Sequence, residues 1–431
     1  MKQIFKPLMN ANGTLIGAGV LKISVYQRLL AVLSLCSGFA FSVTADSPIR
    51  PGDRIAFVGN TFADQLRMYG YLETLLLQRS IEKPISIRNL GWAGDMLTAR
   101  DRPTNFPTEE STLTAHKTDV IVACFGMGES FAGEAGVDGF KEDLIDFIAS
   151  HKGRKYNGKS EVRLILISPI AYEDHGRRTP NWERRNRELS AYTGAMNSVA
   201  KQAGLPFVDL NRPTSDLMED YSAPKMTGNG VNLNAYGYWC VSRTLADALL
   251  PGVKPWRVNV DAGAVKGSGQ GVELSNINRS GNGIRFTVAE KSWPSLGAPV
   301  KGNIHRRLSA HRDRLFVKNL SGGDYRLTID GKPITTASAQ QWAEGLAITG
   351  SPAHVALQAY RDAVYDKNVN FVYSWKALNQ VHIVGERRKS NSGRALPAEI
   401  IEFNKIAIAK DAALAKGIEL KAREWRLIPI K

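Results

Sequence analysis

The stretch Arg54-Ile-Ala-Phe-Val-Gly-Asn-Thr-Phe-Ala63 decides the fold. Its apolar residues, 55–58, predict a short buried strand, and Gly59-Asn60-Thr61 interrupts that strand. The residues that follow, 64–79, are rich in Leu, Arg, Glu and Gln and predict a helix. In α/β enzymes, nucleophiles are found at strand-to-helix turns, at the carboxyl edge of a parallel sheet. Thr61 is therefore the first candidate catalytic residue.

The first 45 residues differ in composition from the rest of the chain. They hold four basic residues and no acidic one, then an apolar run over 29–43 that ends in Val43-Thr44-Ala45. This pattern is typical of a bacterial-type secretory signal. We expect cleavage after Ala45, export to the periplasm or the extracellular space, and no membrane span in the mature chain. A retained anchor is the alternative, although the run is shorter than the roughly 20 residues of a span.

Charge and cysteine content narrow the range of partners and cofactors. Loss of the first 45 residues would lower the formal net charge from +15 to +11. The basic residues are dispersed and no nucleic-acid motif is present, so we expect a solvated basic surface and no nucleic-acid partner. Cys124 lies in an apolar run and is expected to be a buried free thiol. No histidine pair has metal-ligand spacing, and Gly126-x-Gly128 lacks the rest of a phosphate-binding fingerprint, so no metal or cofactor is predicted.

The chain after the expected signal changes character twice. Over 46–250, short apolar runs alternate with helical stretches, which predicts a parallel sheet covered on both faces. Over 251–340, glycine-punctuated β-like runs predict a small antiparallel accessory sheet, with Gly267-Ser-Gly-Gln270 as a loop tip. The region 341–431 is expected to be mostly helical and to end in a long helix over 399–421. The tryptophans of the C-terminal half are expected in the core, namely Trp342, Trp375 and Trp425.

Three further stretches accompany Gly59-Asn60-Thr61 in the first region. They are Asn89-Leu-Gly-Trp-Ala-Gly94-Asp95, Phe125-Gly-Met-Gly128-Glu129-Ser130 and Thr227-Gly-Asn229-Gly-Val-Asn232-Leu-Asn234. Their order resembles the SGNH/GDSL hydrolase superfamily, and most of all an exported group with a C-terminal β-plus-helix extension. The resemblance implies a flavodoxin-like three-layer α/β/α sandwich with a parallel sheet, plus a smaller C-terminal α+β extension. It implies ester hydrolysis in active members, by a serine nucleophile, a histidine base and an oxyanion site.

The resemblance assigns roles to five positions, and three of them carry unsuitable side chains. Thr61 stands at the nucleophile position, and Gly94 keeps the backbone N–H of the oxyanion site. Gly128 stands where the family has an asparagine donor, and the loss of one such donor typically costs about 100- to 1,000-fold in rate. Asn229 and Asn232 stand at the acid and the histidine, and an amide cannot act as a base near neutral pH.

Three other side chains are candidates for a replacement base. His175, Glu129 and Glu173 fall on loops at the carboxyl edge of the predicted sheet, although solvated loop residues are the simpler interpretation. Two hypotheses follow. One is a catalytically impaired or inactive protein that binds a carbohydrate or an acyl ester in a cleft lined by Trp92, Asn60, Asn229 and Asn232. The other is an active carboxylic-ester hydrolase, such as a polysaccharide deacetylase, that uses Thr61. Nothing in the sequence indicates the oligomeric state.

Overall fold

The computed structural model describes residues 47–431, apart from 104–105, 253, 301–302, 378–388 and 431. The expected secretory signal, with its cleavage point at Ala45, lies outside the described residues. Within the described part of the chain, no helix combines the length and the apolar character needed to cross a membrane.

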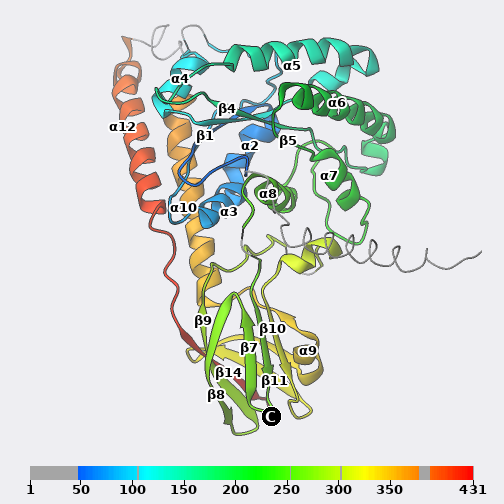
Figure 1. Cartoon of the computed structure of the whole chain (residues 1–431), viewed down its shortest axis with the longest axis vertical. Helices are drawn as coiled ribbons and strands as arrows, with labels where there is room; N and C mark the ends of the chain where they lie inside the picture. The colour runs from blue at the N-terminus through cyan, green and yellow to red at the C-terminus, as the bar shows by residue number, and fades with distance from the viewer. Residues whose placement is uncertain (1–46, 104–105, 253, 301–302, 378–388, 431) are drawn as a thin grey trace, which may run out of the picture. The chain divides into compact units, whose positions relative to one another are not determined.

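A five-stranded parallel sheet forms the centre of the N-terminal region (Figure 1). Its strands follow the order β2-β1-β3-β4-β5, and every neighbouring pair is parallel. This order is the flavodoxin-like one, so the predicted fold class is confirmed. The strands are nearly continuous apolar runs because helices cover both faces. Their bounds are β1 Arg54–Gly59, β2 Ser86–Asn89, β3 Val120–Cys124, β4 Arg163–Ile167 and β5 Phe207–Val208.

Alternate residues of β1 enter two separate apolar cores. Ile55 and Phe57 pack with side chains of α2, α3 and α8, whereas Ala56 and Val58 pack with side chains of α5 and α6. Figure 1 shows these two groups of helices on opposite sides of the sheet. The helices of this region are α2 Thr61–Tyr69, α3 Tyr71–Arg79, α4 Glu109–His116, α5 Val137–His151, α6 Trp182–Ala203, α7 Asn211–Met218 and α8 Ala235–Leu249; short 3-10 turns are η1 Glu129–Ala132, η2 Glu134–Gly136, η3 Gly176–Arg178 and η4 Arg306–His311.

The prediction of one helix over 64–79 is wrong in two respects: the helix begins earlier, and it is interrupted in the middle. It begins at Thr61, because the Asn60 side chain caps it by accepting a hydrogen bond from the Phe62 N–H over 3.0 Å. It breaks at Gly70, whose φ of 65° ends α2 and separates it from α3. Gly59 is required just before the helix, since a Cβ there would lie 2.1 Å from the carbonyl oxygen of Cys124.

The C-terminal part contains two sheets instead of the single small antiparallel one predicted. Their orders are β13-β10-β6-β7 and β12-β11-β14-β9-β8. All pairs are antiparallel except β6 with β10. The expected loop tip at 267–270 is a strand, β7. The strands are β6 Arg257–Asp261, β7 Lys266–Gln270, β8 Val272–Ser280, β9 Gly283–Glu290, β10 Arg314–Lys318, β11 Asp324–Ile329, β12 Lys332–Ser338, β13 Leu346–Ala347 and β14 Arg423–Pro429.

The chain after β12 divides between the two halves of the described structure. α9 (Ala339–Glu344) packs on β10, while α10 (Pro352–Trp375) packs on α2, α3 and β2. α12 (Asn391–Leu414) lies along α10 and ends before the residue 421 expected from the sequence. The chain then returns to the second sheet as β14, between β11 and β9, where a helical region was expected. Trp342, Trp375 and Trp425 are buried, as predicted.

Candidate functional site

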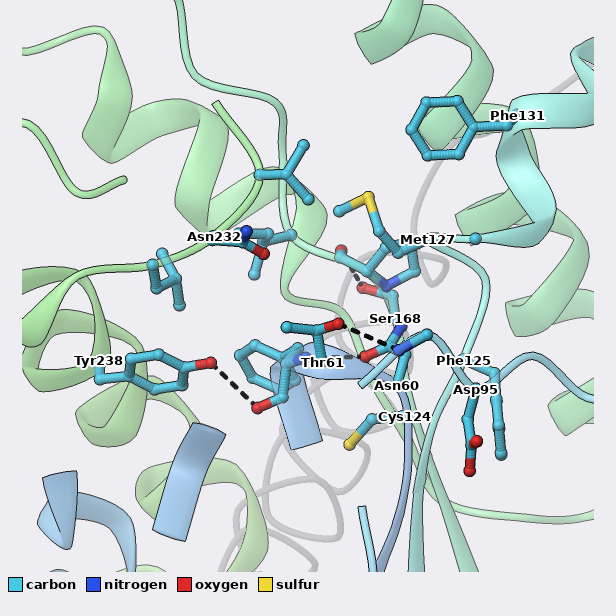
Figure 2. A pocket seen from close by; sticks show the side chains of 17 residues that line it. Asn60, Thr61, Asp95, Cys124, Phe125, Met127, Phe131, Ser168, Asn232 and Tyr238 are labelled. Atoms are coloured by element: carbon cyan, nitrogen blue, oxygen red, sulfur yellow. Dashed lines mark hydrogen bonds between the residues drawn. The ribbon is translucent and has the colours of Figure 1, made fainter. Parts of the chain in front are cut away.

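A cavity of about 210 Å³ lies at the carboxyl ends of β1, β3 and β4 (Figure 2). This is the edge at which ligands bind in open α/β sheets. Most of the lining side chains are apolar or aromatic. The lining consists of Asn60, Thr61, Phe62, Gly94, Asp95, Cys124, Phe125, Met127, Gly128, Phe131, Ser168, Pro169, Ile170, Val231, Asn232, Leu233 and Tyr238.

Thr61 and Gly94 lie next to each other in the lining of the cavity. Thr61 is the first residue of α2, and its Oγ1 accepts a hydrogen bond from the Gly94 N–H over 3.3 Å. Gly94 has a φ of 88°, and nothing lies within 4 Å of a Cβ position there, so the backbone beside this N–H is not crowded. The positive end of the α2 dipole faces the same point. A negative charge that developed next to Thr61 would therefore meet two favourable features.

Gly128 also lines the cavity, but the space beside it is filled. A Cβ built on Gly128 would lie 2.7 Å from Cγ and 3.1 Å from Sδ of Met96. The backbone at Gly128 is ordinary αR, with φ −67° and ψ −47°, so a side chain there would be opposed by Met96, which would have to shift, and not by the backbone. The space beside Gly128 is thus taken by a methionine from the loop after β2. Nothing in the sequence pairs these two residues.

Asn229 and Asn232 belong to one turn but differ in position. Asn229 Oδ1 accepts hydrogen bonds from the backbone N–H groups of Val231 and Asn232, at 3.2 and 2.8 Å, and does not line the cavity. Asn232 does line it, and Figure 2 shows it on the same side as Tyr238. The predicted lining of the cleft was Trp92, Asn60, Asn229 and Asn232. Of these four residues, Asn60 and Asn232 line the cavity, whereas Trp92 and Asn229 do not, so the prediction is wrong for the latter two.

His175 and Glu173 form a buried cluster with Thr227 that does not include Thr61. His175 Nε2 lies 3.2 Å from Glu173 Oε2 and 2.8 Å from Thr227 Oγ1, while Arg178 Nη2 lies 3.2 Å from His175 Nδ1. Glu173 also accepts hydrogen bonds from the N–H groups of Met226 and Thr227, at 3.0 and 2.7 Å. The cluster holds the loop that carries Asn232. None of its members lines the cavity.

The Glu129 carboxylate is also engaged in hydrogen bonds with the backbone. Its carboxylate accepts hydrogen bonds from the Gly126 N–H at 2.8 Å and the Leu97 N–H at 2.9 Å. Burial raises the pKa of Glu129, while these backbone donors oppose the rise. The contacts join the loop after β3 to the loop that carries Gly94. Glu129 supports the walls of the cavity and makes no contact with Thr61 among the described residues.

Three titratable side chains belong to the described lining of the cavity, and each is engaged or inert. Asp95 forms a bidentate pair with Arg102, at 2.8 and 2.6 Å. Burial raises the pKa of the Cys124 thiol well above its usual range, so the thiolate is disfavoured. Tyr238 donates its hydroxyl to the Phe62 carbonyl over 3.0 Å, and burial raises the pKa of this phenol too. The described lining therefore offers Thr61 no free base.

Trp92 faces the C-terminal extension. Its ring packs edge-on against Phe106 and Trp375, with centroids 5.6 Å apart in both pairs. The ammonium of Lys376 lies 4.7 Å from the centre of the Trp92 ring and 2.7 Å from Oδ1 of Asp64, in the first turn of α2. The end of α10 thus holds both the Gly94 loop and the helix that begins at Thr61. No sequence signal indicates this contact, since about 280 residues separate the partners along the chain.

No group of three or more His, Cys, Asp or Glu side chains is arranged to hold a metal ion within the part of the chain that the structure describes. Cys124 and Cys240 are both buried free thiols.

Comparison with known sequences gives no match, either to a protein family or to a curated protein. Solved structures do match. A gut microbial diltiazem-metabolizing enzyme is similar over 89% of this chain and 99% of its own, with a TM-score of 0.68 and 17% identity. Because the alignment covers most of this chain, the shared fold extends beyond the parallel sheet into the C-terminal part.

Two smaller enzymes cover about half of the chain. A catalytic mutant of an acetylxylan esterase from Geobacillus stearothermophilus covers 47% of this chain and 96% of its own, with a TM-score of 0.38 and 17% identity. An alpha/beta hydrolase enzyme from the metagenome of Lake Arreo, Spain, covers 48% and 98%, with a TM-score of 0.36 and 14% identity. At 17% identity, the fold is what this chain shares with the diltiazem-metabolizing enzyme.

Proposed function

We propose that this chain is an exported SGNH/GDSL hydrolase-like protein that binds an acyl ester in the cavity at Thr61 and hydrolyses it very slowly or not at all. The observation that carries the proposal is the set of contacts at Thr61 Oγ1. Its hydrogen bond comes from the Gly94 N–H, which donates, and no described side chain is placed to accept its proton.

The energetics of ester hydrolysis support this proposal. A threonine hydroxyl needs an adjacent base to become a nucleophile, and a positioned base typically contributes about 100- to 10,000-fold in rate. The side-chain donor missing at Gly128 is worth about another 100- to 1,000-fold. Gly94 and the start of α2 still offer the backbone part of an oxyanion site. A site with these backbone donors but without a base suits binding of an ester better than its hydrolysis.

The lining favours an acyl or aromatic group over a sugar ring. Phe125, Met127 and Ile170 are apolar walls, and the neutral side-chain amide that adds polarity beyond Asn60 is Asn232. Asn60 itself is occupied as the cap of α2. An apolar cavity with a few polar groups is the usual form of a small-ligand site. A carbohydrate would leave many hydroxyl groups without partners here, so the acyl ester is the better candidate.

An active carboxylic-ester hydrolase is the second candidate, and one observation favours it. Thr61 Oγ1 lies in the cavity, at a helix N-terminus and beside a backbone N–H, which is the placement that an acyl-transfer nucleophile requires. A base supplied by water or by the substrate would be enough for slow turnover.

The test is the hydrolysis of p-nitrophenyl acetate by the mature chain and by Thr61→Ala. We expect equal rates, both close to that of buffer with an inert protein. A serine-directed fluorophosphonate should leave Thr61 unlabelled. Turnover that depends on Thr61, or stoichiometric labelling of its hydroxyl, would establish the second candidate instead.

Binding is measured separately, by titration with a non-hydrolysable ketone analogue of a short-chain ester. Val231→Trp should abolish binding because it fills the cavity, whereas Val355→Trp, at an exposed position on α10, serves as the matched control. If both variants bind like the parent chain, the cavity is not the binding site.

A further inference from the structure

A second cavity, of about 340 Å³, lies between α4, α10 and α12, and is separate from the one at Thr61. Figure 1 shows these three helices next to one another at one end of the parallel sheet. We call it the α4–α12 groove. It is lined by Arg54, Arg88, Pro107, Ser111, Thr112, Ala115, His116, Phe371, Ser374, Trp375, Ile400, Ile401, Asn404 and Ile408.

The charged lining of the groove is positive. Arg54 and Arg88 belong to the described lining, and no acidic residue does. Arg88 is neutralised, because its Nη1 lies 2.7 Å from Asp411 Oδ2. Arg54 donates from Nε to the carbonyl oxygen of His116, and no described carboxylate forms an ion pair with its guanidinium. Its two terminal nitrogens are therefore available to a ligand that enters the groove.

The charged groups packed behind the groove are paired with one another and with Arg88. Lys367 is fully buried, with Nζ 2.6 Å from Glu73 and 3.9 Å from Asp411. The pKa of His116 is lowered well below its usual value, first by burial and then by Arg88, Arg54 and Lys367. His116 is thus neutral, and its side chain interacts with Ser86 Oγ and Thr118 Oγ1, each at 3.3 Å. Lys367 pairs with Glu73 and Arg88 pairs with Asp411, whereas the Arg54 guanidinium forms no ion pair with a described carboxylate; Asp119 accepts the Arg54 backbone N–H, at 2.8 Å.

The other walls of the groove are apolar and partly open to solvent. Phe371, Trp375 and Ile400 are buried at its base. Ile401 and Ile408 belong to the same face of α12 and are 57% and 53% exposed. Two half-exposed isoleucines beside a buried aromatic base form an apolar surface that water covers poorly. A ligand chain lying on them would remove that surface from water.

We propose that the α4–α12 groove binds a carboxylate with an apolar tail, of the medium-chain fatty acid type. The carboxylate pairs with Arg54, and the tail lies over Trp375 and the isoleucines of α12. The planar guanidinium of an arginine suits a carboxylate because it can donate two parallel hydrogen bonds. The volume is near the lower end of the roughly 300–1,000 Å³ of small-ligand pockets, which fits a single chain better than a polycyclic ligand.

The test is calorimetric titration of the mature chain with decanoate below its micellar concentration. One molecule should bind per chain, and decanol and decyltrimethylammonium should bind at least tenfold more weakly because they lack the negative charge. Arg54→Gln should weaken decanoate about 10- to 100-fold, as expected for a charge-assisted hydrogen bond. Ile408→Asn should weaken it severalfold.

Two control variants separate binding in this groove from binding elsewhere on the chain. Arg257→Gln removes an exposed arginine of β6 and should leave the affinity unchanged. Val231→Trp fills the Thr61 cavity and should also leave it unchanged, so this result does not depend on the proposed function. The proposal is overturned if decanoate does not bind, if Arg54→Gln binds it as well as the parent chain does, or if Val231→Trp abolishes binding.

Discussion

Met96 occupies the space that a side chain at Gly128 would need, with its Cγ 2.7 Å from the Cβ position. The two residues belong to loops that follow different strands, β2 and β3, and both loops contribute residues to the lining of the cavity. A side chain at residue 128 would require Met96 to move. This side of the cavity therefore combines a residue without a side chain, Gly128, with a methionine that fills the space beside it.

Under the proposed function, this relationship predicts how ester hydrolysis could be increased. Asn232→His with Asn229→Asp supplies a base and a carboxylate, and should raise p-nitrophenyl acetate turnover about 100-fold or more over the parent chain. Adding Gly128→Asn to that double variant should help only when Met96→Ala makes room for it. The rate should then rise about another 100-fold. If the combined variant is folded and no faster than the parent chain, Thr61 is not at a restorable site.

The contact between Trp92 and Trp375 predicts that α10 stabilises the site. Trp375→Ala should lower the free energy of unfolding by about 3–5 kcal/mol, because a buried indole is replaced by a cavity. It should also speed amide hydrogen exchange in residues 91–97. Tyr373→Ala, on the same helix but 52% exposed, is the matched control and should change stability by less than about 1 kcal/mol. Equal exchange in both variants would contradict a role for α10 at the Gly94 loop.

The buried pair of Lys367 and Glu73 predicts a large cost when one partner is removed. Lys367→Met leaves the Glu73 carboxylate buried with only the Asn368 amide, which donates to it over 2.9 Å. We expect a loss of about 3–5 kcal/mol in denaturant unfolding. Adding Glu73→Leu should restore most of the loss, because no unpaired charge then remains. A double variant as unstable as Lys367→Met alone would show that packing, and not charge, is responsible.

Glu290 predicts a specific dependence of stability on pH. Burial and the neighbouring Asp313 raise its pKa to about 7, and its Oε2 is buried without a described partner. A carboxyl whose folded pKa is raised stabilises the fold at low pH, and this contribution is lost as pH rises from about 4.5 to 7. Glu290→Gln should remove the loss, which makes the variant about 2–3 kcal/mol more stable than the parent chain at pH 8.

The measurement for Glu290 is the difference in unfolding free energy between the two chains at pH 4.5, 6 and 8. The difference should grow with pH. Glu273→Gln, which removes the exposed partner of Lys291, is the control and should show no such growth. A difference that stays flat across this range would show that the pKa of Glu290 is not raised in the folded chain.

Local sequence was sufficient for the parallel sheet and for part of the site. The strands β1, β3 and β4 are buried on both faces. Their continuous apolar composition is therefore enough to identify them as central strands of a parallel sheet. The carboxyl ends of such strands meet at one edge, which brings the loops of Thr61, Gly94, Gly128 and Asn232 to one cavity. The sequence prediction of the helix bounds failed at two places. The Asn60 N-cap makes α2 begin at Thr61, and the left-handed conformation of Gly70 ends it.

The sequence by itself determined the strand-to-helix order and the fold class, and it places residues that cannot act as bases at 128, 229 and 232. Only the tertiary structure decided that Asn229 turns away from the cavity, that Met96 fills the space at Gly128 and that α10 holds Trp92. It also decided that the final residues form β14, the third strand of a five-stranded sheet. The physical reason is the separation of the partners along the chain. Composition and periodicity indicate whether a residue is buried, but they do not indicate which residue it contacts. These contacts join segments that are tens to hundreds of residues apart.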